Sequence, residues 1–148
     1  MSTVEADLTR SVRERTERIK PEECWELLAR EGFGRLALAV ADGVDIVPLN
    51  FVVDRRSIVL RTAEGSKLTE MSRSSAVALE IDDRDPVSGV AWSVVAKGRP
   101  RILTAEDEVA AVEALGVRTW SGTSKKMRYV RIEISEVTGR RFHGIPTA

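Results

Sequence analysis

The sequence predicts a mainly β fold with short helices, arranged as a small antiparallel barrel. Short stretches rich in Val, Ile and Leu follow one another along most of the chain. Turn-forming residues such as Asp42-Gly43 separate several of them. The segments with a helical pattern are short and lie between the expected strands. Strands in series with short turns, and helices as insertions, are typical of small antiparallel barrels.

The first expected element is a charged segment over residues 1–20. Leu8, Val12 and Ile19 are spaced as a thin apolar stripe on one side of a helix. We interpret this segment as a helix that frays or packs on a partner.

A stronger helix is expected over residues 21–31. Pro21 suits the first helical position, and Gly32 is typical of a helix end. The helix places Cys24 on one face together with Leu27 and Leu28. We therefore interpret Cys24 as a core residue and not as a reactive thiol.

Strands are then expected at 35–41, 44–53, 57–62, 77–81, 89–103 and 128–134. The first three are closely spaced and predict an antiparallel meander. Pro48 interrupts the second strand, which requires a sheet edge or a bulge there. Gly98 predicts a bend or bulge in the long fifth strand.

Two short helices are expected between these strands. Gly65 and Ser66 open the first, in which Leu68 and Met71 face inward. Thr104 and Asp107 have the spacing of a capping box and open the second, which runs to Leu115.

Composition limits the function classes. The 148 residues fit one domain, and 23 basic residues balance 23 acidic ones, which argues against nucleic acid as a partner. No apolar run approaches the roughly 20 residues of a membrane span, and the N-terminus lacks the apolar core of a secretion signal, so a cytoplasmic location is expected. One cysteine and one histidine exclude an internal disulfide and multi-Cys or multi-His metal sites within one chain. We expect no metal, and an enzyme built from this chain would take its chemistry from an organic cofactor.

The segment from Arg61 to Lys67 is the most informative. A strand supplies Arg61 and Thr62, and Gly65 and Ser66 lead into a helix whose first turn carries Lys67. A guanidinium, hydroxyls, an ammonium and free backbone N–H groups are the ligands that a phosphate prefers. A solvated loop with ordinary surface charges is the alternative. The pattern of a nucleotide-binding Walker loop is absent.

Two further segments are candidates for a flat ligand. Pro48 frees backbone groups near Asn50 to face an aromatic ring, although a bulged core strand explains the same residues. Trp92 lies among small residues. Either its indole N–H donates a hydrogen bond to a partner, or the side chain packs in the core. Trp120, in a polar loop, is a candidate for an interface.

Taken in order, these segments resemble the FMN-binding split-barrel family related to pyridoxamine 5′-phosphate oxidase. The likeness is closer to its small bacterial branch, which includes nitroimidazole-reductase-like proteins. The resemblance rests on the stretches 23–28, 34–37, 48–51, 60–68, 92–93 and 138–141. It covers most of the chain beyond residue 20.

The resemblance implies a six-stranded antiparallel split barrel over residues 21–143, followed by a tail at 144–148. It also implies a homodimer that holds two FMN molecules at the subunit interface. The phosphate would be held by Arg61, Thr62, Ser66 and Lys67. The isoalloxazine ring would lie against the backbone of Pro48, Leu49, Asn50 and Phe51, with Trp92 and Ser93 approaching from the partner.

Three activities stay open. The first is a flavin-dependent oxidoreductase with an unknown small-molecule substrate. That substrate is not expected to be pyridoxamine phosphate, because Gly144 follows Arg141-Phe142-His143 where the oxidase has an acidic residue. The second is an F420-dependent enzyme, whose basic groove would use Arg99, Arg101, Lys125, Lys126 and Arg128. The third is a non-enzymatic flavin or haem carrier or sensor, with His143 as the axial haem ligand. No catalytic side chain is evident.

Overall fold

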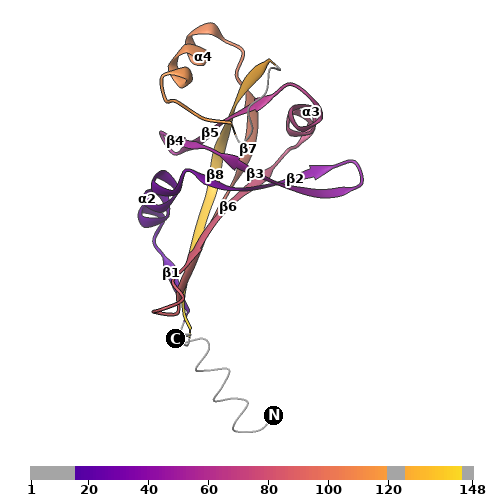
Figure 1. Ribbon diagram of the computed structural model, residues 1–148. Coiled ribbons are helices and arrows are strands. Elements are labelled where there is room, and N and C mark those ends of the chain that lie inside the picture. Colours follow the sequence, from indigo (N-terminus) through magenta and orange to yellow (C-terminus); the bar gives the residue numbers. More distant parts are fainter. Residues whose placement is uncertain (1–15, 120–125, 145–148) are drawn as a thin grey trace.

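The computed structural model describes residues 16–119 and 126–144, which form one antiparallel sheet with three helices packed on it (Figure 1). The strands along the sheet are ordered β3-β2-β6-β7-β8-β5-β4, and β1 pairs with β8 beside this path. The mainly β class is therefore confirmed. The strands are β1 (Thr16–Ile19), β2 (Phe33–Val40), β3 (Gly43–Asn50), β4 (Val52–Asp54), β5 (Ser57–Ala63), β6 (Val77–Arg84), β7 (Val90–Ile102) and β8 (Met127–His143); the helices are α2 (Pro21–Glu31), α3 (Ser66–Arg73) and α4 (Glu106–Glu113).

The end of the charged N-terminal segment is a strand, so the helix expected there is wrong for residues 16–19. β1 pairs with the last part of β8, and Ile19, the one buried residue of the strand, lies opposite Gly139. A single apolar side chain in four residues gives no strand alternation, so only the pairing with β8 identifies this strand. Leu8 and Val12 lie outside the described residues.

Helix α2 has the predicted bounds. Gly32 ends it in the left-handed conformation, with φ of 65°, which glycine adopts without a steric penalty. Cys24, Leu27 and Leu28 are buried as expected, and burial raises the pKa of the Cys24 thiol, with a smaller contribution from the charge of Glu23. The thiol is thus a core group, as the sequence predicted.

Strand β3 lies at the sheet edge, which accounts for Pro48. The expected meander is wrong, because the chain leaves this edge at Phe51 and continues as β4 at the opposite end of the strand order. The Phe51 side chain is buried and its amide donates to the Gly32 carbonyl at 3.0 Å. This contact takes the chain out of the β3 ladder, so β5 pairs with β4 and β8 and not with β3.

Strands β7 and β8 form a ribbon that runs the length of the molecule, from β1 at its lower end in Figure 1 to α4 at its upper end. The bulge predicted at Gly98 is present, since the register shifts between Lys97 and Gly98 and leaves Ser135 of β8 without a cross-strand partner. β8 continues to His143, well beyond the expected end at residue 134.

The two short helices occupy different places on the sheet. Helix α3 packs through Met71, which is buried, and through the half-buried Leu68, as predicted. Helix α4 begins at Glu106, and no side chain caps it, so the capping box at Thr104 is wrong. Thr104 precedes the helix and lines a cavity.

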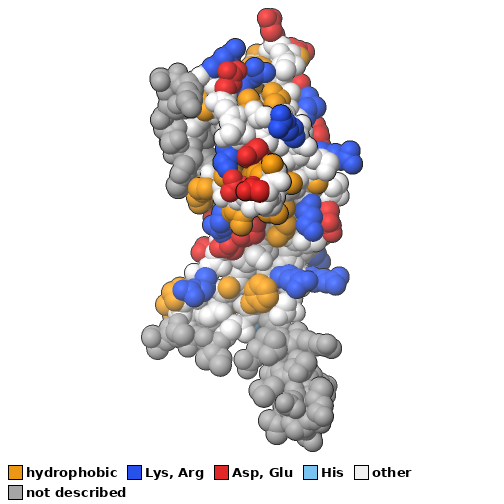
Figure 2. Space-filling view, turned by 90° about the vertical axis from the view of Figure 1, so that its right-hand side faces the viewer, with side chains coloured by type: hydrophobic (Ala, Val, Ile, Leu, Met, Phe, Trp, Pro, Cys, Tyr) orange, Lys and Arg blue, Asp and Glu red, His pale blue; other side chains and the backbone are white. Residues whose placement is uncertain are grey.

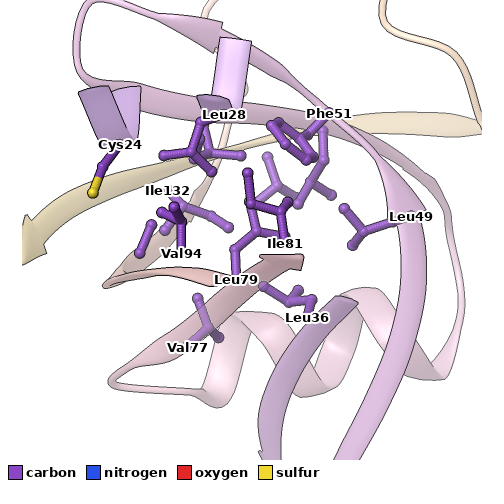
Figure 3. Close-up of a cluster of buried hydrophobic side chains, with 14 of the residues drawn as sticks. Cys24, Leu28, Leu36, Leu49, Phe51, Val77, Leu79, Ile81, Val94 and Ile132 are labelled. Atoms are coloured by element: carbon purple, nitrogen blue, oxygen red, sulfur yellow. The ribbon is translucent and has the colours of Figure 1, made fainter. Parts of the chain in front are cut away.

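The main core lies between α2, α3 and the concave side of the sheet. Figure 3 shows Leu28 of α2, Leu79 and Ile81 of β6 and Ile132 of β8 converging in it. A smaller cluster holds α4 against β5 and β8 through Val59, Leu103, Val112, Val117 and Tyr129. Within the described ranges, no helix is long and apolar enough to cross a membrane.

The β2–β3 hairpin projects from the body of the molecule. Figure 2 views the molecule from the side toward which this hairpin points, and hydrophobic side chains are exposed among acidic and basic ones at the centre of the view. Val44 and Ile46 of β3 are 72% and 64% exposed. An apolar edge of this kind is typical of a surface that meets another molecule.

Candidate functional site

The structure brings the two most informative sequence segments together at one cavity. This cavity has a volume of about 170 Å³ and lies between β3, β5 and the start of α3. Of the predicted site residues it is lined by Pro48, Leu49, Arg61, Thr62 and Lys67. Met71 of α3, Met127 of β8 and Thr119 complete part of the wall.

Arg61 carries a buried polar group that no hydrogen bond satisfies. Its Nε is buried and has no hydrogen-bond partner, and no ion pair to Arg61 is present within residues 16–119 and 126–144. The guanidinium carbon lies 5.7 Å from the centre of the Tyr129 ring, which stabilises the cation without using its N–H donors. A buried donor without a partner costs about 1–3 kcal/mol. An anionic ligand at this position would remove that cost.

The N-terminus of α3 adds a second attraction for anions. Gly65 precedes the helix with φ of 154°, a conformation that side chains disfavour, and nothing lies within 4 Å of the place of its missing Cβ. The first turn has no acidic residue and no side-chain cap. Its N–H groups and the helix dipole therefore remain available to a negative group, beside the exposed Ser66.

Lys67 is engaged within the chain. Its ammonium forms an ion pair with Asp45 of β3 and lies 3.9 Å from a carboxylate oxygen of Glu70. The hydrogen bond from Lys67 holds the pKa of Asp45 below its ordinary value. A phosphate that recruits Lys67 must compete with Asp45, so Arg61 offers the readier contact.

The residues 48–51, predicted to lie against the isoalloxazine ring, do not all line the cavity. The Asn50 side-chain amide donates to the Thr119 carbonyl at 3.3 Å, which ties β3 to the chain after α4. Phe51 is a core residue, and its amide is occupied by Gly32. Within one chain, only Pro48 and Leu49 of this segment reach the cavity.

Trp92 and Ser93 are not brought to this cavity within one chain. They pair with Arg141 and Arg140 at the β1 end of the β7–β8 ribbon. Arg61 pairs with Tyr129, on the half of β8 nearer to α4. Trp92 is half-buried and packs against the main core.

A second and larger cavity adjoins the first through Arg61 and Met127. It has a volume of about 540 Å³ and lies between β5, the start of β8 and α4. Its lining comprises Arg61, Leu103, Thr104, Val109, Glu113, Lys126, Met127, Arg128 and Tyr129.

Two of the five cations considered for an F420 groove are paired with acidic residues of the chain. Arg101 forms a bidentate pair with Glu108 and a further contact with Glu133. Arg128 pairs with Glu64 at 3.3 Å. Lys125 lies outside the described residues, as does Trp120.

The residues that echo the oxidase's Arg-x-His are engaged near β1. Arg141 pairs with Glu23 of α2, and His143 Nε2 lies 2.9 Å from a Glu17 oxygen. These contacts hold α2 and β1 onto β8.

The sequence pattern of the pyridoxamine 5′-phosphate oxidase family matches residues 20–141, which is most of the chain. The chain belongs to this family. The resemblance inferred from the motifs at 48–51 and 60–68 is thereby confirmed. Membership in the pyridoxamine 5′-phosphate oxidase family fixes neither substrate nor activity, since one scaffold carries many functions.

Solved structures of other proteins are similar in fold. The FAD binding protein of Mycobacterium smegmatis is 35% identical with a TM-score of 0.72, covering 86% of this chain and 98% of its own. A candidate pyridoxamine 5′-phosphate oxidase of Corynebacterium glutamicum is 34% identical with a TM-score of 0.74, covering 88% and 96%. A candidate 5-nitroimidazole antibiotic resistance protein of Bacteroides thetaiotaomicron, 14% identical with a TM-score of 0.72 and covering 86% and 89%, shares the fold.

Sequence reasoning missed part of the cavity lining. Tyr129, Leu103 and Glu113 line the larger cavity, and Met71 the smaller. Tyr129 lies on the final strand opposite Arg61, and only knowledge of the β5–β8 register would have placed the two together. No local sequence signal identifies that register.

Proposed function

We propose that this chain is a flavin-dependent oxidoreductase that binds the FMN unit of its cofactor at Arg61. The observation that carries the proposal is Arg61, which lines the cavity, forms no ion pair within the described residues and has a buried Nε without a hydrogen-bond partner. It lies in the same cavity as Thr62 and Lys67, next to an uncapped helix start. An Arg donor, a hydroxyl, an ammonium and helix N–H groups fit a phosphate monoester.

The chain's residues would divide the binding work. Arg61 and Lys67 would neutralise the phosphate, while Thr62, Ser66 and the first turn of α3 donate hydrogen bonds. The isoalloxazine ring would lie along Pro48 and Leu49. Similarity to a mycobacterial FAD binding protein supports a flavin as the ligand.

The cofactor would supply the redox chemistry by carrying a hydride or electrons. The protein's part would be to orient the ring and exclude water from one of its faces. Pyridoxamine phosphate is not favoured as the substrate, because Arg141 is already paired with Glu23 and His143 lies against Glu17. A haem ligand role for His143 would require it to leave the same contact.

We further propose that the sheet of each chain forms a split barrel and that two copies of the chain complete the site. The 170 Å³ cavity is smaller than the roughly 300–1,000 Å³ of typical ligand sites. Trp92 and Ser93, remote from the cavity in one chain, would then approach the flavin from the partner. The exposed Val44 and Ile46 offer apolar surface for that contact.

The phosphate assignment is tested with Arg61→Ala combined with Lys67→Ala. The double variant should lose co-purifying yellow colour and bind added FMN at least about 100-fold more weakly, because two charge-assisted contacts are removed. Binding is measured by quenching of flavin fluorescence. The matched control is Lys97→Ala with Arg99→Ala, which removes one exposed lysine and one exposed arginine outside both cavities. Stoichiometric FMN in the double variant would refute the assignment.

The dimer is tested by measuring the mass in solution at micromolar concentration. We expect twice the 16.4 kDa of the chain. A monomer that still binds flavin stoichiometrically would contradict a site shared between subunits.

A further inference from the structure

The tip of the β2–β3 hairpin, residues 39–45, extends beyond the rest of the sheet (Figure 1). Strand β6 pairs with β2 only as far as Leu38, and β3 is an edge strand. Within the described part of the chain, the tip therefore pairs with no strand outside its own hairpin. Contacts from outside the sheet are needed to fix its position.

Two polar contacts join this tip to the rest of the described residues, and both involve α3. The Ser74 hydroxyl, directly after the helix, lies 3.4 Å from the Ala39 carbonyl oxygen but only 2.9 Å from the carbonyl oxygen of Glu70, which is the better acceptor. The Lys67 ammonium, in the first turn of α3, forms an ion pair with the Asp45 carboxylate. The stronger of the two contacts is therefore the pair between Lys67 and Asp45.

The two faces of the tip have different surroundings. Asp45 lies opposite the buried Leu38, on the face that meets α3. Because side chains alternate along a strand, Val44 and Ile46 lie on the other face, where both are exposed. Lys67 thus holds, from one side, the strand whose other side carries the apolar surface proposed to meet a second copy of the chain.

Lys67 also lines the cavity proposed for the flavin, together with Arg61. Its ammonium is shared between Asp45 and Glu70, and the nearer Glu70 oxygen, at 3.9 Å, is buried without a hydrogen bond. A half-exposed ion pair such as that with Asp45 is weak. A phosphate monoester carries nearly two negative charges, so one held at Arg61 attracts the ammonium more strongly than a single carboxylate does.

We propose that Lys67 couples the cavity to the hairpin: a bound phosphate draws the ammonium away from Asp45 and so releases the tip from the start of α3. The inference rests on the proposed function, since it requires the flavin phosphate at Arg61. The released tip is then free to adjust its apolar face to the second copy. Coupling between two sites is reciprocal, so any contact that draws the tip away from Lys67 tightens flavin binding by the same factor.

The experiment compares FMN with riboflavin, which has the same ring and no phosphate, each at saturation on the full chain. In the flavin-free chain the hydrogen bond from Lys67 holds the pKa of Asp45 below its ordinary value of 3.8. FMN should raise this pKa, because the hydrogen bond is lost and a negative charge arrives, whereas riboflavin should leave it unchanged. Carboxyl NMR titration measures the pKa. Amide hydrogen exchange in residues 39–45 should be about two- to fivefold faster with FMN than with riboflavin, as expected for the loss of one weak ion pair.

Three variants sharpen the test. In Lys67→Gln the pKa of Asp45 should already be raised without flavin, and FMN should add only the smaller effect of its charge. Asp45→Asn should tighten FMN binding about two- to fivefold and leave riboflavin binding unchanged. Asp42→Asn is the matched control, since it makes the same chemical change at an exposed acid of the tip that forms no ion pair within the described residues, and it should affect neither flavin.

The possible results separate this inference from the proposed function. If FMN binds tightly and the pKa of Asp45 is the same as with riboflavin, Lys67 stays on Asp45; the inference is then overturned and the proposed function stands. A rise in this pKa that riboflavin also produces would assign the release to the ring and overturn the inference in the same way. Failure of both flavins to bind would overturn both proposals.

Discussion

Helices α2 and α3 are both short and amphipathic and neither has a side-chain cap at its N-terminus, but the charges in their first turns are opposite. Helix α2 has Pro21 at its start, Glu22 and Glu23 in its first turn and a left-handed Gly32 at its end. Helix α3 starts after Gly65 with no cap and no acidic residue, and carries Lys67 in its first turn. The acids of α2 neutralise its helix dipole, whereas the lysine of α3 adds to its positive end.

Helix α2 also buries more side chains than helix α3 does. Helix α2 is held by three buried side chains and by Gly139 of β8, where a Cβ would lie 2.7 Å from the Cys24 sulfur. Helix α3 buries only Met71 and adjoins a cavity. The difference teaches that α2 is a structural element, while α3 leaves polar groups unsatisfied on the side where a ligand is expected.

The largest expected effect concerns packing. Leu28→Ala in α2 should lower the free energy of unfolding by about 2–5 kcal/mol, because Leu28 is fully buried and its removal leaves a cavity. Leu68→Ala in α3 should cost only about 1 kcal/mol, since that side chain is half-buried. Urea denaturation of the two variants measures both values, and equal losses would remove the contrast between the helices.

The next largest effect concerns the charged side chains in the first turns of α3 and α2. Lys67→Gln should raise the dissociation constant of the flavin about tenfold with little change in the stability of the apoprotein. Glu22→Gln in α2 should do the reverse, lowering stability by about 0.3–1 kcal/mol and leaving flavin affinity unchanged. Titration with FMN and thermal unfolding separate these outcomes. A Lys67→Gln variant that binds flavin normally would show that α3 is not an anion site.

The smallest expected effect concerns Asp45, whose carboxylate competes with the flavin phosphate for Lys67. Asp45→Asn should tighten flavin binding about two- to fivefold, because Lys67 no longer has to leave an ion pair. The pKa of Asp45 is lowered, so its pair with Lys67 contributes stability above the ordinary value of 3.8, and this is lost as the pH falls through the lowered pKa. The stability difference between wild type and variant should therefore disappear in acid. A difference that persists there would argue against the pair.

Short sequence motifs predicted the elements whose ends are set by residues close to them in the sequence. The bounds of α2 follow from Pro21 and Gly32, and the β2–β3 turn from Asp42-Gly43. The bulge at Gly98 was also predictable, because a glycine inside a strand often marks a bulge or a close approach of two backbones. A Cβ there would lie 2.0 Å from the Glu133 carbonyl oxygen.

Pairings between distant segments were not predictable in this way. Residues 135–143 alternate weakly, and they extend β8 only because β7 and β1 lie on either side of them. The departure of the chain at Phe51 depends on a contact with Gly32 across the core. At the site, the sequence supplied Arg61 and Lys67. The Arg61–Tyr129 contact arises from the β5–β8 register, and the Lys67–Asp45 contact from the placement of α3 relative to β3.

The position of Pro48 on the edge strand also bears on solubility. An exposed edge with Val44 and Ile46 is the kind of template on which strands of other molecules add, and such addition can continue into fibrous aggregates. Proline has no amide hydrogen to offer an incoming strand, and the charged Asp45 disfavours a flat apolar stack. Pro48, which lies on the edge strand beside the cavity, thus also limits uncontrolled polymerisation of the protein in a crowded cell.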